Sequence, residues 1–265
     1  MLQVNEHPVD FHQGITLTEI AKTVKPNADV FIVNGFPVPS ETVLTDGDDC
    51  WLITKGERIS PGEMEHLLYA RHTPGVQKVV KSSTIGVMGL GGLGSVVALA
   101  LARIGVGKLL LADYDVVEPS NLNRQQFFID QIGMKKTDAL RENLARINPY
   151  VNVETFDGEL TEENIPLIFK NVTALAECFD GATMKACALR AALTSLPGVG
   201  YVGASGLAGY EDNNTITTKR LHDNIYIIGD DEAEAKPGQG LMAPRVGIAA
   251  HHQANQILRI LLGFG

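Results

Sequence analysis

The chain has 265 residues, of which 45% are hydrophobic, so it is long enough for one substantial domain and a small one. Its formal net charge of −9 argues against a broad basic surface for nucleic acid, so any phosphate ligand must meet a local basic pocket. The three cysteines form no Cys-x-x-Cys pair, which is typical of a protein of the reducing cytoplasm without structural zinc. We expect neither a secretory signal nor a membrane span, because no basic stretch leads into an apolar run and later apolar segments are interrupted.

The first 57 residues have the pattern of a small, separate α+β domain. Strands are predicted at 2–4, 30–33 and 50–53, and a helix over 18–24, with turn signals between them. The order of a hairpin, a helix and short strands resembles the β-grasp fold of ThiS-type sulfur carriers. That resemblance rests on Val33-Asn34-Gly35, Val38-Pro39 and Asp46-Gly47-Asp48. Some other small α+β domain is the alternative.

Residues 58–82 are predicted to form a linker and a short helix over 63–70 that carries Arg71 and is ended by Thr73-Pro74-Gly75. From residue 83 to residue 265, strand and helix patterns alternate. This alternation predicts a Rossmann-like α/β domain, with a mostly parallel sheet covered by helices on both faces. The expected strands are 85–88, 108–112, 151–156, 172–178, 200–203 and 224–228, and the expected helices are 95–104, 136–147, 162–169, 184–193 and 246–262.

A glycine-rich turn joins the first strand of this domain to its first helix. It reads Gly89-x-Gly91-Gly92-x-Gly94, and Asp113 stands at the tip of the next strand, at about the spacing of an acid that accepts hydrogen bonds from ribose hydroxyls. Glycines in this context let backbone N–H groups approach a phosphate at the start of a helix. The alternative is that the glycines serve only close packing of helix and sheet. We predict a nucleotide site here.

The residues after Asp113 distinguish between nucleotides. In the loop Asn121-Leu122-Asn123-Arg124-Gln125, three side chains are amides and Arg124 supplies a guanidinium, and Lys136 adds a charge at the start of a helix. A guanidinium binds phosphate oxygens in a fork and stays charged at any working pH. In a nicotinamide dehydrogenase, the guanidinium and the lysine would have no evident role in binding or catalysis. The cluster therefore favours ATP over NAD, although an isolated lysine such as Lys136 is most often a solvated surface residue.

These motifs occur in an order that resembles the ThiF/MoeB/HesA family, the bacterial relatives of ubiquitin-activating enzymes. The resemblance runs from about Glu65 to the C-terminus and includes Ile-Gly-x-x-Lys, Arg-Ile-Asn-Pro and an aspartate after Cys178-Phe179. It implies that ATP is held by Gly92, Asp113, Asn121, Arg124, Gln125 and Lys136.

The resemblance also implies that Asp180 binds Mg²⁺. An aspartate followed by a glycine at a strand end is more often a turn or cap residue, so this role competes with a structural one. Magnesium prefers carboxylate and phosphate oxygens and retains waters, so one carboxylate together with ATP makes a sufficient site.

The implied reaction is attack by the C-terminal carboxylate of a small carrier protein on the α-phosphorus of ATP, which gives an acyl-adenylate and pyrophosphate. Arg124, Lys136 and the magnesium on Asp180 are the expected counter-charges. Arg71 is a further candidate, because Leu68-Tyr69-Ala70-Arg71-His72 resembles a family segment whose second arginine reaches the ATP of the partner subunit. This resemblance predicts a homodimer.

Two departures from the family pattern limit the comparison. Many relatives bind zinc through two Cys-x-x-Cys pairs, whereas residues 188–265 contain no cysteine, so no zinc is expected. Cys178 and Cys187 are interpreted as packing residues rather than nucleophiles, which implies a separate sulfur-donor protein. The carrier-like domain ends in Lys55-Gly56-Glu57 instead of Gly-Gly and continues into the linker, so the substrate is expected to be a separate ThiS-like carrier.

The leading hypothesis is therefore a sulfur-carrier adenylyltransferase, placed in thiamine (thiazole) synthesis because the fused domain is ThiS-like. Three alternatives remain. The enzyme activates a molybdopterin-type carrier or another small carboxylate; the chain is a non-catalytic, nucleotide-binding regulator of a carrier system; or it is a nicotinamide dehydrogenase.

Overall fold

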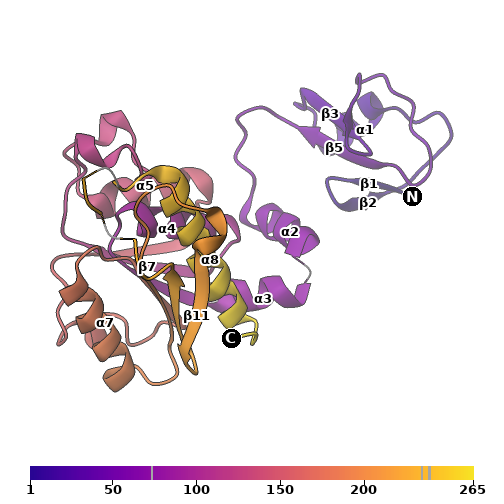
Figure 1. Cartoon of the computed structure of the whole chain (residues 1–265). Helices are drawn as coiled ribbons and strands as arrows, with labels where there is room; N and C mark the ends of the chain where they lie inside the picture. The colour runs from indigo at the N-terminus through magenta and orange to yellow at the C-terminus, as the bar shows by residue number, and fades with distance from the viewer. Residues whose placement is uncertain (73, 234, 238–239) are drawn as a thin grey trace. The chain divides into compact units, whose positions relative to one another are not determined.

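The computed structural model describes residues 1–72, 74–233, 235–237 and 240–265 (Figure 1). The chain divides into two compact units, Met1–Arg71 and His72–Gly265. Within the described ranges, no helix combines the length and the apolar character needed to cross a membrane.

The first unit is a mixed five-stranded sheet with the order β2-β1-β5-β3-β4. Its first and last strands, β1 and β5, are neighbours and run parallel, while the other pairs are antiparallel. Leu17 and Ile20 of α1 and Leu2 and Leu52 of the sheet share one apolar cluster. This is the expected β-grasp arrangement. The elements are β1 (Leu2–Val4), β2 (His7–Val9), α1 (Leu17–Val24), β3 (Val30–Val33), β4 (Phe36–Pro37), β5 (Asp49–Ile53) and α2 (Pro61–His72).

Helix α1 begins at a reciprocal cap. The Thr16 hydroxyl accepts a hydrogen bond from the Glu19 amide (3.3 Å), and the Glu19 carboxylate accepts one from the Thr16 amide (2.9 Å). Both bonds satisfy amides that lack partners inside the helix. The backbone bond from Thr16 to the carboxylate lowers the pKa of Glu19. The cap therefore fixes the start of α1, the helix that packs against this small sheet.

We predict that Thr16→Ala destabilises the first unit by about 1 kcal/mol, because the substitution removes the acceptor for an N-terminal amide. Trp51, the only tryptophan of the chain, lies in β5, so its fluorescence in a urea titration follows this unit. Thr23→Ala is the matched control: among the described residues, its hydroxyl bonds only to the Ile20 carbonyl near the other end of α1, and we expect a change within about 0.5 kcal/mol. Equal effects of the two substitutions would contradict the capping role.

The second unit contains a seven-stranded sheet and the glycine loop. Its elements are α3 (Pro74–Ser82), β6 (Thr84–Met88), α4 (Gly92–Arg103), β7 (Lys108–Asp113), α5 (Lys136–Ile147), β8 (Asn152–Asp157), α6 (Ile165–Ile168), β9 (Ala174–Glu177), α7 (Ala182–Ser195), β10 (Gly200–Ala204), β11 (Thr217–His222), β12 (Ile225–Gly229) and α8 (Ala243–Leu261). Short 3₁₀ turns lie at Pro119–Asn121, Ile129–Gln131 and Asn213–Thr215.

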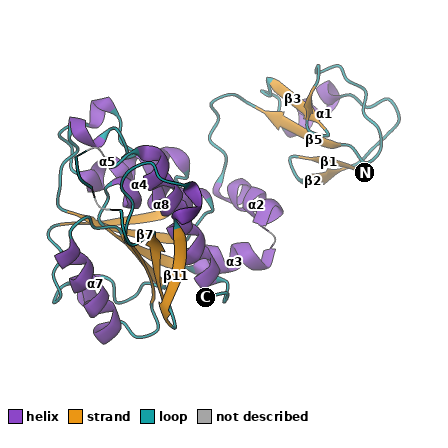
Figure 2. Cartoon of the chain, in the orientation of Figure 1, coloured by secondary structure: helices purple, strands orange, loops and turns teal. Residues whose placement is uncertain are grey.

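The strand order is β11-β12-β10-β9-β6-β7-β8, and all neighbours except the β11–β12 pair are parallel. Helices α4, α5 and α8 lie on one face of the sheet and α7 on the other (Figure 2). Side chains of α4, α5 and α8 belong to one apolar cluster, and those of α6 and α7 to a second. Alternate side chains of β6 point to opposite faces of the sheet. Ile85 and Val87 belong to the apolar cluster with α4, α5 and α8, and Met88 belongs to the cluster with α6 and α7. The Rossmann-like α/β domain expected from the sequence is therefore confirmed.

Several elements differ from the sequence prediction. The helix expected over 162–169 is confined to Ile165–Ile168. Thr73-Pro74-Gly75 was expected to end the helix that carries Arg71, and α2 does end at His72, while Thr73 lies outside the described residues. The helix that follows was not expected: Pro74 is the first residue of α3, a position where its missing N–H costs nothing. Strand β11 was not predicted, because all six of its side chains are exposed and no alternation marks it.

Candidate nucleotide-binding site

The predicted site residues of the second unit gather at one edge of its sheet. The chain runs from β6 outward to β7 and β8, then crosses back to place β9 on the other side of β6. The carboxyl ends of β6 and β9 therefore lie side by side where the strand order reverses. In open α/β sheets, ligands bind in the crevice at such a point. The glycine loop follows β6, Asp113 ends β7, and Asp180 follows β9 by three residues.

The glycine loop is held in contact with the first turn of α4. Gly89 has φ +85°, and a Cβ placed on Gly94 would lie 1.9 Å from the Gly89 carbonyl oxygen. Only glycine fits at position 94, and glycine is strongly favoured at 89. No side chain caps the helix at Gly91, and its first turn carries no acidic residue. The free amides at this helix end suit an anion.

Asp113 is bonded to the glycine loop itself. Its Oδ2 accepts a hydrogen bond from the Leu90 amide (2.6 Å), and its Oδ1 accepts one from the Asp115 amide (2.8 Å). The carboxylate thus braces the loop against the end of β7. Its predicted contact with ribose hydroxyls would use the remaining lone pairs of the same two oxygens.

The Asn121–Gln125 segment lies against the glycine loop. A Cβ on Gly92 would be 3.3 Å from Cγ of Arg124, and one on Gly91 would be 3.7 Å from Nε2 of Gln125. The side chain of Gln125 is buried, and its Oε1 has no hydrogen-bond partner among the described residues. An orphaned amide oxygen beside uncapped helix amides marks a place where polar ligand groups fit.

Ser95 joins this segment to α4. Its hydroxyl donates to the Gly91 carbonyl (2.7 Å) and accepts from the Gln126 amide (3.1 Å). The Asn121 side chain is buried and accepts from the Glu118 amide (3.0 Å), so it stabilises the turn that precedes Arg124. Asn121, predicted to contact ATP, therefore has a structural role as well.

The guanidinium of Arg124 is partly exposed and makes only neutral contacts. Its Nη1 donates to the Ser120 carbonyl (3.3 Å) and to Oδ1 of Asn123 (2.8 Å). No carboxylate neutralises it among the described residues, so its charge is available to an anion.

Lys136, in contrast, is paired within the chain. It is the first residue of α5, its side chain is buried, and its Nζ lies 2.8 Å from Oδ2 of Asp115. The Asp115 side chain is half exposed. Any phosphate that Lys136 binds would share the ammonium with this carboxylate or displace it.

Asp180 lies in the exposed turn between β9 and α7 and makes no hydrogen bond or ion pair with any described residue. Within residues 1–72, 74–233, 235–237 and 240–265, no group of three or more His, Cys, Asp or Glu side chains is arranged to hold a metal ion. A magnesium ion bound by Asp180 would therefore draw its other ligands from phosphate and water, which suits that cation.

Two neighbours of Asp180 were not predicted from the sequence. Glu177, almost fully buried at the end of β9, accepts from Lys185 Nζ (3.0 Å) and from the Phe179 amide (2.8 Å). Burial raises the pKa of Glu177 against the opposing charge of Lys185. Both line a cavity of about 300 Å³ between α7 and strands β10–β12. The sequence did contain a signal for Glu177: a single acidic residue at the end of the apolar run Ala174-Leu-Ala-Glu177 indicates a buried, paired carboxylate.

The remaining predicted residues are Arg71, in the first unit, and the two cysteines of the second unit. Arg71 is exposed on α2 at the end of the first unit, and its role stays a prediction. Cys178 is buried and Cys187 is half-buried; burial raises the pKa of both thiols, so neither is a ready thiolate at neutral pH.

A parallel α/β sheet whose strand order reverses beside a glycine loop and a helix start defines a Rossmann-like protein. The model of the ThiF family matches residues 65–265, and the model of the ThiS-like ubiquitin family matches residues 1–56. The chain belongs to the ThiF family, with a ThiS-like unit at its N-terminal side.

Among curated proteins, the molybdopterin-synthase adenylyltransferase of Haemophilus influenzae is 31% identical over 199 residues, which cover 71% of this chain and 79% of that protein. The ubiquitin-like modifier-activating enzyme 5 of Arabidopsis thaliana is 49% identical over 82 residues, which cover 31% of this chain. The match spans only 19% of the length of that plant protein.

Among solved structures, the tRNA N6-threonylcarbamoyladenosine dehydratase TcdA of E. coli, crystallised with ATP, superposes with a TM-score of 0.70 at 21% identity. The superposition covers 78% of this chain and 98% of that one. E. coli MccB, also solved with ATP, gives a TM-score of 0.57 at 19% identity, over 80% and 65% of the two chains. These likenesses establish a shared fold.

We predict that Gly94→Ala abolishes nucleotide binding and lowers stability by about 1–3 kcal/mol, because the new methyl group meets the Gly89 carbonyl and must push the loop off α4. Binding of a fluorescent ATP analogue and thermal unfolding measure the two effects. Gly247→Ala is the matched control: its Cβ would meet nothing within 4 Å in the first turns of α8. We expect this control to bind normally and to gain about 0.5–1 kcal/mol. Normal binding by the Gly94 variant would contradict the loop assignment.

Proposed function

We propose that this protein adenylates the C-terminal carboxylate of a separate ThiS-like carrier protein ending in Gly-Gly, with ATP as the donor and pyrophosphate as the second product. The observation that carries the proposal is the juxtaposition of the uncapped first turn of α4 with Arg124 and the orphaned Oε1 of Gln125. Membership of the ThiF family and the named adenylyltransferase relatives support it.

In this proposal, the chain supplies positions and charges rather than a nucleophile. The amides that follow Gly91 bind phosphate oxygens, and Asp113 receives the ribose hydroxyls. Arg124, which has no carboxylate partner among the described residues, stabilises the negative charge that develops on the transferred group and on pyrophosphate. Lys136 assists when its ammonium turns from Asp115 towards the phosphates.

We further propose that Asp180 and the nucleotide together hold a magnesium ion, which neutralises phosphate charge when bound. The lack of any protein partner for the Asp180 carboxylate among the described residues supports this role, because a purely structural turn residue would use that group locally. Arg71 is proposed to complete the site of a second copy of the chain in a homodimer.

The fused N-terminal unit is not proposed as the substrate. The segment after β5 is held down: Lys25 Nζ lies 2.7 Å from the Glu57 carboxylate, and the Lys55 amide donates to Asp29 (3.2 Å). A carrier must instead present a free, extended carboxyl end to the nucleotide. The unit is therefore proposed to aid docking or regulation.

Thiamine (thiazole) synthesis is the proposed pathway, because the fused unit is ThiS-like. The second candidate is activation of a molybdopterin-synthase carrier. It is favoured by the relative from H. influenzae, whose aligned region covers most of both chains. In either case, sulfur is proposed to come from another protein, because neither thiol near the site is activated.

The activity test is pyrophosphate exchange into ATP with the full chain, Mg²⁺ and a carrier protein ending in Gly-Gly. Exchange that requires the carrier's free carboxyl end is the expected result. Parallel reactions with ThiS-type and molybdopterin-type carriers separate the two pathways. ATP binding without exchange, at saturating concentrations of both carriers, would instead favour a non-catalytic regulator.

We predict that Arg124→Ala and Asp180→Ala each lower the exchange rate by roughly 10²–10³, because each removes a counter-charge to the reacting phosphates. Thermal unfolding should stay near that of the wild type, since neither side chain is fully buried. Arg190→Ala is the control: it removes an exposed arginine paired with Glu162 and should leave exchange unchanged. Near-normal exchange by either site variant would mean that the site is misplaced.

We also predict that Cys178→Ala and Cys187→Ala keep near-normal exchange rates. Burial raises the pKa of both thiols, so the thiolate is scarce at neutral pH and appears only under alkaline conditions. Exchange by the wild type should accordingly resist iodoacetamide at pH 7. Rapid inactivation that one of these variants prevents would show that its thiol takes part in the reaction.

A further inference from the structure

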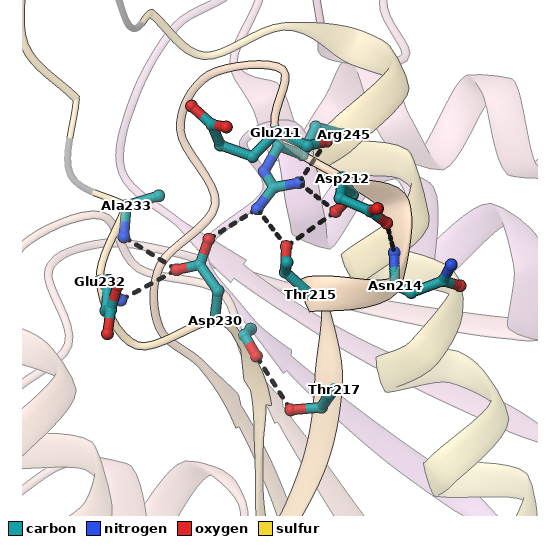
Figure 3. A network of polar contacts seen from close by, with 10 residues as sticks. Glu211, Asp212, Asn214, Thr215, Thr217, Asp230, Glu232, Ala233 and Arg245 are labelled. Atoms are coloured by element: carbon teal, nitrogen blue, oxygen red, sulfur yellow. Dashed lines mark hydrogen bonds and ion pairs between the residues drawn. The ribbon is translucent and has the colours of Figure 1, made fainter.

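Two loops at the carboxyl edge of the sheet are tied to the start of α8 by one buried arginine (Figure 3). Arg245 is 3% exposed. Its Nη1 donates to the carbonyls of Glu211 (3.1 Å) and Asp212 (3.2 Å), and its Nη2 donates to the Thr215 hydroxyl (3.0 Å) and to Oδ2 of Asp230 (2.6 Å). One guanidinium therefore joins residues 205–216, the β10 loop, to residues 230–233, the β12 loop.

Asp230 completes the connection on its other side. Its Oδ1 accepts from the amides of Glu232 (2.9 Å) and Ala233 (2.8 Å), so the carboxylate orders the first residues after β12. The Ala233 carbonyl in turn accepts from the amides of Leu207 (3.1 Å) and Ala208 (3.3 Å). The lack of a side chain at Gly206 leaves room for the Asp230 carboxylate, because a Cβ on Gly206 would lie 2.1 Å from Oδ1 of Asp230.

The same end of α8 contacts the nucleotide site. A Cβ on Gly92 would lie 2.9 Å from Cγ1 of Val246, the residue after Arg245. The Asn123 side chain donates to the Leu241 carbonyl (2.9 Å), and Arg124 Nη1 donates to Asn123. The first turn of α8 is thus shared between the phosphate-binding motif and the two loops.

The strand order places these two loops at the same edge of the sheet as the nucleotide site. Strands β10 and β12 are parallel to β9 and β6, so the loops that follow them leave the sheet at the edge that carries Gly89–Gly94 and Asp180. The nucleotide residues occupy the β6–β7 side. The β10 and β12 loops border the other half of the crevice, where a second substrate would approach the nucleotide.

We propose that Arg245, paired with Asp230, is a positioning residue that fixes the β10 and β12 loops against the nucleotide site and thereby sets the affinity for the acyl substrate. This inference rests on the proposed adenylation for the identity of that substrate, the carboxyl-terminal tail of a carrier. No catalytic role is assigned to Arg245, because its Nη1 and Nη2 already donate to four protein acceptors. Its Nε is buried and has no hydrogen-bond partner among the described residues.

The test compares the full-length wild type with Arg245→Lys, which keeps the charge but loses the fork, and with Asp230→Asn, which keeps the size but loses the charge. Amide hydrogen exchange is followed in residues 205–216 and in α4. KM is measured for ATP and for a Gly-Gly carrier that supports pyrophosphate exchange by the wild type. We expect amides of 205–216 to exchange at least about tenfold faster, while α4 is unchanged. We expect KM for the carrier to rise about tenfold or more, with KM for ATP unchanged.

Arg259→Lys is the matched control, because Arg259 lies in the last turn of the same helix and, within the described part of the chain, its guanidinium donates to the Phe264 carbonyl alone. It should change neither quantity. If the amides of residues 205–216 exchange hydrogen at the wild-type rate in both test variants, the proposal is overturned, whether or not any carrier is adenylated. Equal rises in KM for ATP and carrier also overturn it, because they indicate general damage to the fold. If no carrier supports exchange in the wild type, the proposed function fails, and hydrogen exchange still decides the positioning role.

Discussion

The contact between Gly94 and the Gly89 carbonyl is the constraint on which the site depends. With no room for a side chain, α4 begins directly against the end of β6, and its free amides face the carboxyl edge of the sheet. Asp113 bonds to the same loop, and Ser95 holds the Asn121–Gln125 segment to the same helix end. Loss of this contact would move the loop, the arginine and the orphaned amide together.

The electrostatics of the site are local, as an acidic chain of net charge −9 requires. Arg124 is held by neutral oxygens, so its charge is free for a ligand, whereas Lys136 is already paired with Asp115. The two cations therefore have different parts in the proposed reaction. Arg124 offers a fixed counter-charge, and Lys136 offers one that is gained only when its pair with Asp115 opens.

Much of the fold and part of the site could be predicted from the sequence. Periodic apolar runs located β6, α4, β7, α5 and α8, because these elements bury a face in the core. The exposed strand β11 has no such pattern and was missed. The glycine loop was found from spacing, but the roles of Ser95 and Arg245 were not, because contacts with Gln126 and Asp230 depend on how distant segments pack.

We propose that the carboxyl edge of the sheet is divided between nucleotide residues after β6 and β7 and loops for the acyl substrate after β10 and β12. At this edge, a carrier's carboxylate is proposed to take AMP from ATP. Intact-mass spectrometry of a Gly-Gly carrier, incubated with the full chain, ATP, Mg²⁺ and a pyrophosphatase, tests this reaction. We expect a carrier heavier by one adenylyl group, and no such species with Arg124→Ala. An unmodified carrier beside a wild-type chain that binds ATP would contradict this proposal.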